Sequence, residues 1–533
     1  MQKFNFKISG AAGEGIKVAG LIFAQTAFRQ GLYVHGYTEY PSLIRGGLNT
    51  FQVCADVQPV LAPEAKFDLE ISLNNPSLGK PKNIFAVGFA CARLGLNLAA
   101  LQTVIKETFV KKTTAVIKHN LAAAEQGYKS CQNPLQPIAR PPLTNQILLS
   151  GNDALSLGAI AGGLKFFTAY PMSPSTSILH FLAAKAKKTG IAVRHGEDEI
   201  GVVNMALGAS FAGARSLVAT SGGGFSLMNE AIGLAGVSET PLVIVNAMRP
   251  GPATGMPTWT GQADLLFAIH ASQDEFPRIV LTPGDPEEAF VLAKLALNLA
   301  EKYQLPIIIL TDKYLAESYF TFNTPAVKQT NQRYGFASTQ NLDTNTPFLR
   351  YSDSKTGVSL RTIPGQPGGV HLANSYEHDE SGYATESSGE RIKQVDKRAR
   401  KITTILKDPE MVKPKLFGPK SAATTIISWG SNKGSLQTAL KSLPDTNFIH
   451  FPCVWPFPKQ EFLHLINKSK KLVTIELNST GQLNQLISQV TGIQIPSKIL
   501  KYDGRPFYPE EIIAKLKIEN WKLWQKTIKG QPE

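Results

Sequence analysis

Hydroxyl and carboxyl groups gather in two neighbouring stretches of the chain. The first is AYPMSPSTS at residues 169–177, and the second is HGEDE at residues 195–199. Two prolines fix φ and remove two backbone donors in the first stretch, which predicts a turn. Each stretch precedes an apolar run with helical periodicity, and Ser175 or Thr176 could cap the first of these helices. The residues fit either two ordinary helix starts or backbone N–H and hydroxyl groups that face a ligand.

Longer motifs follow these stretches in a fixed order. They are GASFAGA at 208–214, ATSGGGFSLMNEAIGLA at 219–235 and RPGPATGMPT at 249–258. Together with YPMSPSTS and GEDE, they make the sequence resemble the alpha subunit of the 2-oxoacid:ferredoxin oxidoreductases over nearly its whole length. Met172 and Ser173 depart from the family's usual YPITP, although Ser173 keeps a hydroxyl.

The resemblance implies oxidative decarboxylation of a 2-oxoacid, with thiamine diphosphate as the electron sink. Glu199 best matches the glutamate that bonds the cofactor's aminopyrimidine ring, and Glu197 is the second choice. A glutamate that bonds the aminopyrimidine ring needs a carboxyl group that is buried and shielded from solvent. Tyr170 and Pro171 are expected beside the same cofactor.

A substrate pocket follows from the same resemblance. Ser173, Arg249 and Thr258 would line it, because a guanidinium group can grip a carboxylate with two parallel hydrogen bonds. For Arg249, an ion pair between subunits is the alternative. The first expectation for the substrate is 2-oxoglutarate, from the EHDE connection at 377–380 and the RPGPATG loop. Pyruvate or a broad range of 2-oxoacids is the second.

Two ligand sets are missing from the sequence. The four cysteines, Cys54, Cys91, Cys131 and Cys453, are too widely spaced for an iron–sulfur or zinc site and are expected to be isolated buried thiols. No Gly-Asp-Gly…Asn element is present for magnesium and diphosphate, and residues 282–285 are expected to form a helix cap. The resemblance therefore implies a separate beta subunit that carries Mg²⁺ and the iron–sulfur cluster, with coenzyme A as co-substrate and ferredoxin as electron acceptor.

The N-terminal part begins with a strand at 4–9, a glycine turn with Gly10, Gly13 and Gly15, and a helix at 16–30. Such a turn can hold an anion, although it can equally be a tight connection, and its spacing differs from the dinucleotide motif. Together with the loop at 39–47, the turn resembles the family's gamma domain, fused ahead of the alpha subunit. The three glycines and Arg45 could contact coenzyme A or another anion, and Arg45 could instead hold a neighbouring subunit.

The expected fold class is α/β, with several doubly wound domains. The expected segments are a gamma-type domain at 1–125, a proline-rich linker at 126–146, a thiamine diphosphate pyrimidine-binding domain at 147–320, an irregular connection at 321–405 and a transketolase C-terminal-like domain at 406–533. In the connection, His378 is expected in a hydrogen-bonded surface loop rather than at a metal.

The charge and hydropathy of the sequence limit the classes of partner and the location that we expect. The formal net charge is +14, but the lysines are scattered, which favours acidic partners or anionic substrates over nucleic acid. The apolar runs are too short to span a bilayer, and the N-terminus lacks an apolar signal core, so a cytoplasmic location is expected.

Two other functions fit parts of the sequence. The chain could be a non-catalytic scaffold subunit, although Glu199 and Arg249 argue against this. It could be a nucleotide-binding dehydrogenase built on the N-terminal glycine turn, although the G-x-G-x-x-G spacing is absent.

Overall fold

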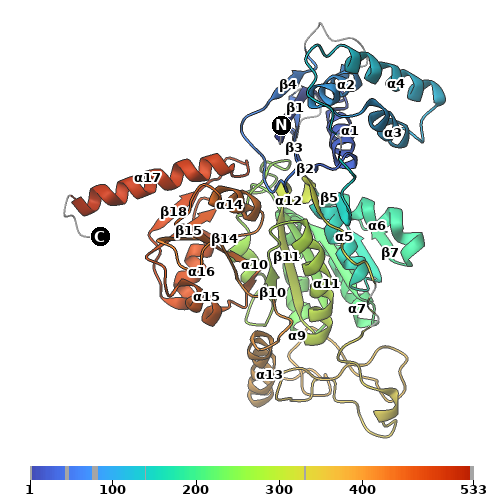
Figure 1. Ribbon diagram of the computed structural model, residues 1–533. Helices are drawn as coiled ribbons and strands as arrows, with labels where there is room; N and C mark the ends of the chain where they lie inside the picture. Colours follow the sequence, from blue (N-terminus) through green and yellow to red (C-terminus); the bar gives the residue numbers. More distant parts are fainter. Residues whose placement is uncertain are drawn as a thin grey trace.

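Three β-sheets organise the chain in the computed structural model, which describes residues 3–42, 47–74, 82–138, 140–328, 330 and 332–528 (Figure 1). Arg45 lies outside the described residues. Among these residues, no helix combines the length and the apolar character needed to cross a bilayer.

The N-terminal sheet has the strand order β4-β1-β3-β2-β12-β5. Its strands are β1 (Lys3–Ala11), β2 (Tyr33–Glu39), β3 (Leu48–Asp56), β4 (Leu69–Ser72), β5 (Gln146–Ser150) and β12 (Tyr319–Asn323), and its helices are α1 (Ile16–Arg29), α2 (Lys82–Leu94), α3 (Leu98–Thr108) and α4 (Thr114–Lys129). The expected strand, glycine turn, helix and strand are present as β1, α1 and β2. However, β3 lies between β1 and β2 and is antiparallel to both.

The central sheet has the order β16-β10-β11-β9-β8-β6-β7 and is parallel except at β16. Its strands are β6 (Phe166–Ala169), β7 (Ala192–His195), β8 (Ser216–Thr220), β9 (Leu242–Met248), β10 (Ile279–Leu281), β11 (Pro306–Asp312) and β16 (Cys453–Trp455). Its helices are α5 (Gly151–Ala161), α6 (Thr176–Thr189), α7 (Glu199–Phe211), α8 (Gly222–Leu227), α9 (Asn229–Val237), α10 (Leu265–Ile269), α11 (Pro286–Tyr303) and α12 (Lys313–Glu317). Buried β-branched and leucine side chains on these strands form two large clusters, one on each face of the sheet.

The C-terminal sheet has the order β13-β15-β14-β17-β18. Its elements are β13 (Lys415–Phe417), β14 (Thr424–Trp429), α14 (Asn432–Leu440), β15 (Thr446–Phe451), α15 (Lys459–Ile466), β17 (Lys471–Glu476), α16 (Gln482–Thr491), β18 (Ser497–Leu500) and α17 (Pro509–Ile528).

Three strands cross the segments expected from sequence. β5 and β12 flank the central domain in the chain, yet they pair with each other and β12 pairs with β2, so they extend the N-terminal sheet. β16 comes from the C-terminal segment and adds an antiparallel strand to β10. An unpaired sheet edge exposes a row of backbone donors and acceptors, and these pairings cover such edges. Alternation of apolar and polar residues predicts a strand, but it does not reveal which sheet edge that strand will pair with.

The connection between the central and C-terminal domains wraps the amino edge of the central sheet (Figure 1). Between β12 and helix α13 (Ser388–Leu406), its regular structure among the described residues is limited to a 3₁₀ turn, η1 (Thr339–Asn341), and isolated bridges. His378 is fully buried there, with Nδ1 3.0 Å from the carbonyl oxygen of Asp379 and Nε2 3.1 Å from that of Val237. The expected hydrogen-bonded loop is present, but its histidine is a core residue because α9 covers it.

Candidate active site

The strand order of the central sheet reverses between β6 and β8, which are adjacent and parallel. β7 lies on one side of β6, whereas β8, β9, β11 and β10 lie on the other. Ligands of open α/β sheets bind outside the carboxyl ends of the strands at such a reversal. The YPMSPS turn follows β6, and Ser221 with the first turn of α8 follows β8. The fold therefore brings these two motifs to the same place.

The YPMSPS turn is held from below by α5. The side-chain amide of Asn152, which is buried, donates to the carbonyl oxygen of Pro174 at 2.9 Å and to Oγ of Ser177 at 2.8 Å. Ser175 stands at the N-cap position of α6, but its hydroxyl donates to the carbonyl oxygen of Met172 at 2.7 Å and does not cap the helix. Tyr170, at the start of the turn, is exposed, and its ring centroid lies 6.3 Å from that of His195.

Glu199 is the first residue of α7 and is buried. Asp198 forms the N-cap of the helix, and its carboxylate accepts a 2.6 Å hydrogen bond from the backbone N–H of Gly201. The Oε1 atom of Glu199 is buried without a hydrogen-bond partner in the structure. Glu197, in contrast, points to the exposed surface. A buried carboxyl oxygen without a partner is costly, so this site suits a ligand that brings a donor.

Arg249 follows β9 and lies against the YPMSPS turn. Its Nη1 atom donates to the main-chain carbonyl oxygen of Ser173 at 2.7 Å. Partial burial lowers the pKa of the guanidinium, and the charge of Asp264 acts in the opposite direction. Burial also raises the pKa of Asp264, whose carboxylate accepts a 3.0 Å hydrogen bond from the side-chain amide of Asn246. The Nη1 group of Arg249 therefore holds the YPMSPS turn in place.

Thr258 lies at the junction with the N-terminal domain. Its hydroxyl is buried and donates to the carbonyl oxygen of Tyr40 at 2.6 Å. The Tyr40 hydroxyl in turn donates to the Glu317 carboxylate at 2.9 Å. The structure thus shows Thr258 tying the RPGPATGMPT loop to the neighbouring domain, and its role in a substrate pocket stays a prediction.

The N-terminal glycine turn carries an internal anion. The carboxylate of Glu14 accepts a 2.7 Å hydrogen bond from the backbone N–H of Ala11, beside Gly10. Gly13 and Gly15 have φ values of 90° and 74°, which lie in the left-handed region that favours glycine. A phosphate bound at this turn would have to displace the Glu14 carboxylate or neutralise its charge. If the turn is only a tight connection between strand and helix, backbone geometry alone explains the glycines.

All four cysteines are free thiols, and three of them are buried as expected. Cys54, Cys91 and Cys453 are buried, and burial raises the pKa of the Cys54 and Cys453 thiols to about 12. Cys131 is partly exposed and also free. In the described part of the chain, His, Cys, Asp and Glu side chains do not come together in threes as a metal site requires.

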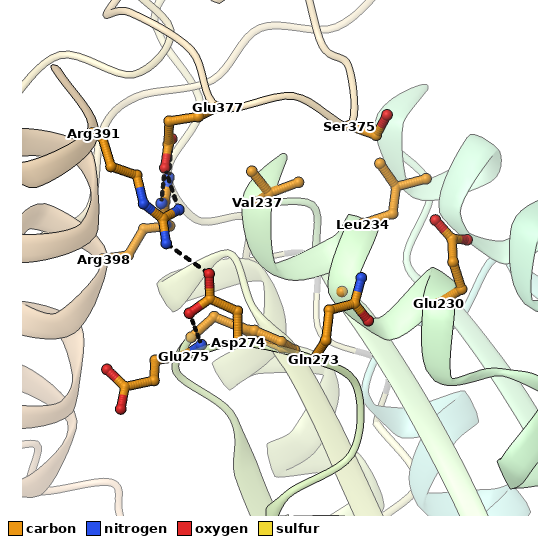
Figure 2. A pocket seen from close by; sticks show the side chains of 12 residues that line it. Glu230, Leu234, Val237, Gln273, Asp274, Glu275, Ser375, Glu377, Arg391 and Arg398 are labelled. Carbon is orange, nitrogen blue, oxygen red and sulfur yellow. Dashed lines mark hydrogen bonds and ion pairs between the residues drawn. The ribbon is translucent and has the colours of Figure 1, made fainter. Parts of the chain in front are cut away.

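A hollow of 190 Å³ lies at the opposite, amino edge of the central sheet, between α9 and α13. Figure 2 shows that its walls carry an ion-pair chain. Arg391 bridges Asp274 and Glu377 at 2.6 and 2.7 Å, and Arg398 contacts both carboxylate oxygens of Glu377. These charges satisfy one another, and the hollow lies at the opposite end of the strands from Glu199.

Known proteins resemble the chain over most of its length. The family model "Pyruvate flavodoxin/ferredoxin oxidoreductase, thiamine diP-bdg" matches residues 157–397, and "Pyruvate ferredoxin/flavodoxin oxidoreductase" matches residues 5–81. The 2-oxoacid:ferredoxin oxidoreductase subunit alpha of Saccharolobus solfataricus is 36% identical over 473 residues, which is 85% of this chain and 73% of that protein. The chain belongs to this family of oxidoreductase alpha subunits.

Two further relatives of this oxidoreductase subunit bear on its substrate. The 2-oxoglutarate synthase subunit KorA of Methanothermobacter thermautotrophicus is 32% identical over 378 residues, 70% of this chain and 98% of that protein. A solved structure of the 2-oxoglutarate:ferredoxin oxidoreductase from Magnetococcus marinus, with 2-oxoglutarate, coenzyme A and succinyl-CoA bound, has a TM-score of 0.89 and 29% identity, and covers 97% of this chain and 100% of that chain. The α/β fold class with a thiamine diphosphate-binding domain is thereby confirmed.

Sequence reasoning missed Asn152 and Asp264 at this site of the oxidoreductase subunit. Asn152 gives no signal beyond its place at a helix start. Asp264 precedes an apolar helix and resembles an ordinary N-cap, yet its side chain makes no capping bond and lies beside Gly222 instead. Gly224 belongs to a recognised glycine run, but only the fold brings it against Glu199.

Proposed function

We propose that this alpha subunit supplies one half of an active site that oxidatively decarboxylates a 2-oxoacid, with Glu199 holding the aminopyrimidine ring of thiamine diphosphate. The observation that carries this proposal is the buried, unpartnered Oε1 atom of Glu199 at the carboxyl edge of the central sheet. When bound, the cofactor supplies the electron sink that decarboxylation of a 2-oxoacid requires.

The surroundings of Glu199 fit a flat, polar ring. Gly224 carries no side chain directly beside the carboxylate, and the Oγ of Ser221 is buried without a hydrogen-bond partner in the structure. Tyr170 and Pro171 are exposed at the mouth of the site. Glu199 would accept a proton from, or share one with, a ring nitrogen, while the surrounding residues exclude water from the carboxylate.

The proposed other half is a beta subunit that carries the diphosphate-binding Mg²⁺ and the iron–sulfur cluster. The solvent-facing side of α7 and α8 lacks charged residues beyond the first turn and carries Ile200, Met205 and Leu227, all exposed by about two-fifths to one-half. Gly208 and Gly223 have open space where a Cβ atom would stand. Such a face, next to Glu199, suits close packing against another protein.

For the substrate we propose 2-oxoglutarate, supported by the 2-oxoglutarate named for the solved relative and for KorA. Pyruvate or a broad range of 2-oxoacids is the alternative, since the solfataricus relative carries only the general 2-oxoacid name. Arg249 and Ser173 would face the substrate carboxylate. Coenzyme A would accept the acyl group, and a ferredoxin would accept the electrons one at a time.

For the domains we propose the division predicted from the sequence. Strands β5, β12 and β16 would join neighbouring domains by pairing across their boundaries. Residues 1–125 would form the gamma-type unit, and the three glycines with Arg45 would be its anion-binding candidates. The proposal of an anion-binding site is weaker than the proposal of a gamma-type unit, because the Glu14 carboxylate already accepts a hydrogen bond from the backbone N–H of Ala11.

The proposal is tested by reconstituting the chain with a beta subunit of the same family and measuring ferredoxin reduction with a panel of 2-oxoacids and coenzyme A. The chain alone is expected to show no iron–sulfur absorbance and no decarboxylation, whereas the complex is expected to be brown and active. A brown, active preparation of this chain alone would overturn the division between two subunits. An assembled complex that decarboxylates no 2-oxoacid would favour the scaffold alternative.

A further inference from the structure

A small cavity lies at the amino edge of the central sheet, at the end opposite Glu199. It is bounded by the turn that precedes β9, from Ser238 to Pro241, and by the connection, through Arg350, Arg361 and His371. Its volume is about 10 Å³, which matches a single water-sized particle. The cavity therefore has room for one water molecule or one monatomic ion.

Two buried guanidinium groups line the cavity with unused donors. Arg350 is 3% exposed, and Arg361 is 5% exposed. Arg350 donates through Nη2 to the carbonyl oxygen of Glu239 at 2.9 Å, but its Nη1 has no partner in the structure. Arg361 donates through Nη1 and Nη2 to Ser210 and Glu301, but its Nε has no partner in the structure. Buried charged donors without an acceptor are expensive, so an acceptor in the cavity is needed.

Positive charge exceeds negative charge around Glu239, which lines the cavity and pairs with two lysines outside the lining. The buried Glu239 carboxylate is held by the ammonium groups of Lys397 and Lys401, each at 2.6 Å. Both lysines are fully buried, and Arg350 adds a third cation to the single carboxylate. This half of the site therefore carries a formal surplus of two positive charges.

The ion-pair cluster that contains Arg361 has the same imbalance, although its other members lie outside the cavity lining. The buried Glu301 carboxylate is shared by Arg215, Arg333 and Arg361, at 2.7, 2.6 and 3.1 Å. Burial lowers the pKa of Arg361 to about 10, and the nearby charge of Arg350 adds to this lowering against the effect of Glu301. A water molecule would accept hydrogen bonds here but would leave the charge surplus in place, whereas an anion would reduce it.

We propose that this cavity, between Arg350 and Arg361, is a chloride-binding site that fastens the connection to the base of the central sheet. Chloride fits the single-particle volume, accepts several N–H donors at once and carries the charge that the site lacks. Because Arg350 and Arg361 belong to the connection and Ser238 to Pro241 belong to the central domain, the ion joins the two. The site is independent of the proposed 2-oxoacid chemistry.

Amide hydrogen exchange of the full chain, followed by mass spectrometry, tests the proposal locally. The backbone N–H groups of Tyr351 and Arg361 donate to Glu380 and Gly335, so peptides that contain them report opening of the connection. Exchange is compared in sodium chloride and in sodium gluconate of equal ionic strength, since gluconate is too large for the cavity. At chloride ten times its Kd, exchange through openings that release the ion should slow about tenfold. Peptides from α2 and α3 in the N-terminal domain should not change.

Two arginine variants distinguish chloride binding in the cavity from a general effect of salt on hydrogen exchange. Arg350→Met should abolish the chloride dependence, whereas Arg400→Met should keep it, because Arg400 is a partly exposed arginine of α13 that pairs with Asp353 outside the cavity. Equal exchange in chloride and gluconate for the wild-type chain would overturn the proposal and assign the cavity to water.

A second measurement does not depend on variants that fold. Crystals of the wild-type chain grown in sodium bromide should show an anomalous peak between Arg350 and Arg361. Featureless anomalous density at this position, together with ordered water in the cavity, would also overturn the chloride assignment.

Discussion

Glu199 and Gly224 face each other so closely that no side chain fits between them. A Cβ atom on Gly224 would lie 2.7 Å from Oε1 of Glu199 and 2.1 Å from Oγ1 of Thr220. The φ of Gly224 is not in the left-handed region, so space and not backbone strain requires glycine here. The turn after β8 thus fixes the depth at which the Glu199 carboxylate lies.

Gly224→Ala should displace the Glu199 carboxylate and lower turnover of the reconstituted complex by about a hundredfold, the loss that a misplacement near 1 Å can cause. Gly389→Ala is the control, because a Cβ atom at that position of α13, away from the proposed subunit interface, would meet only the Oγ atom of Ser387, at 3.8 Å. Steady-state rates of both variants, with circular dichroism to verify folding, provide the comparison. Equal activity of the two variants would show that the position of Glu199 is not critical.

Glu199→Gln should reduce turnover by about 10²–10⁴-fold while the subunits still assemble, because the amide keeps the shape but cannot exchange a proton. Glu197→Gln is the control, since Glu197 is exposed at the start of the same motif. Turnover and gel filtration of each complex measure the two effects. An inactive Glu197→Gln beside an active Glu199→Gln would transfer the assignment to Glu197.

Arg249→Lys should raise the KM for the 2-oxoacid about ten- to a hundredfold, because lysine keeps the charge but loses one charged hydrogen bond of the planar fork. The KM for coenzyme A serves as the internal control and should change little. Should coenzyme A show the larger rise instead, Arg249 binds a phosphate.

Ser173→Ala and Thr258→Val probe the rest of the predicted pocket. Ser173→Ala should act in the same direction as Arg249→Lys but more weakly, since it removes one neutral hydroxyl. Thr258→Val should loosen the N-terminal domain as well, because the Thr258 hydroxyl donates to Tyr40. Thermal unfolding beside the kinetics separates these two effects, and an unchanged KM with lower stability would make Thr258 purely structural.

Glu377 should give the connection an acid-sensitive contact. Burial by itself raises the pKa of its carboxyl, but hydrogen bonds and charge from Arg398, with those of Arg391, lower the pKa from its ordinary 4.5 to about 2. The contribution to stability is therefore complete above about pH 4.5 and is lost as the pH falls towards 2.

Glu377→Gln tests this contact. At pH 7 it should lower the free energy of unfolding by about 1.5–3 kcal/mol, and the gap to the wild type should close as the pH falls below about 4. Thermal unfolding from pH 7 to 3 measures the gap, with the exposed Glu386→Gln as control. A gap that stays constant with pH would show that the lost contact is not ionic.

Local sequence determined the elements of the central domain. Apolar runs bounded by turn residues at 217–220, 242–246, 279–281 and 306–311 predict strands. The structure confirms them as β8, β9, β10 and β11, within two residues at each end. Asp285 caps α11 by accepting from the backbone N–H of Glu288, as expected for the 282–285 segment. These features depend on neighbours in the chain, so periodicity and capping chemistry are sufficient to reveal them.

The motifs determined the family and named Glu199, Ser173 and Arg249 as candidates. What they could not give is how those side chains are held. The contact of Arg249 with the Ser173 carbonyl joins residues 76 positions apart, and the contact of Thr258 with Tyr40 spans 218 positions. Neither leaves a pattern in a local window, because each depends on how separate elements pack.

Only the tertiary structure decided which strands share a sheet, that Gly224 limits the position of Glu199, and that Arg350 and Arg361 share a cavity. Each is a contact between segments that are distant in the chain and become neighbours when sheet edges pair and the connection wraps the central domain. The residue types decide what such contacts can do chemically, whereas packing decides which contacts form.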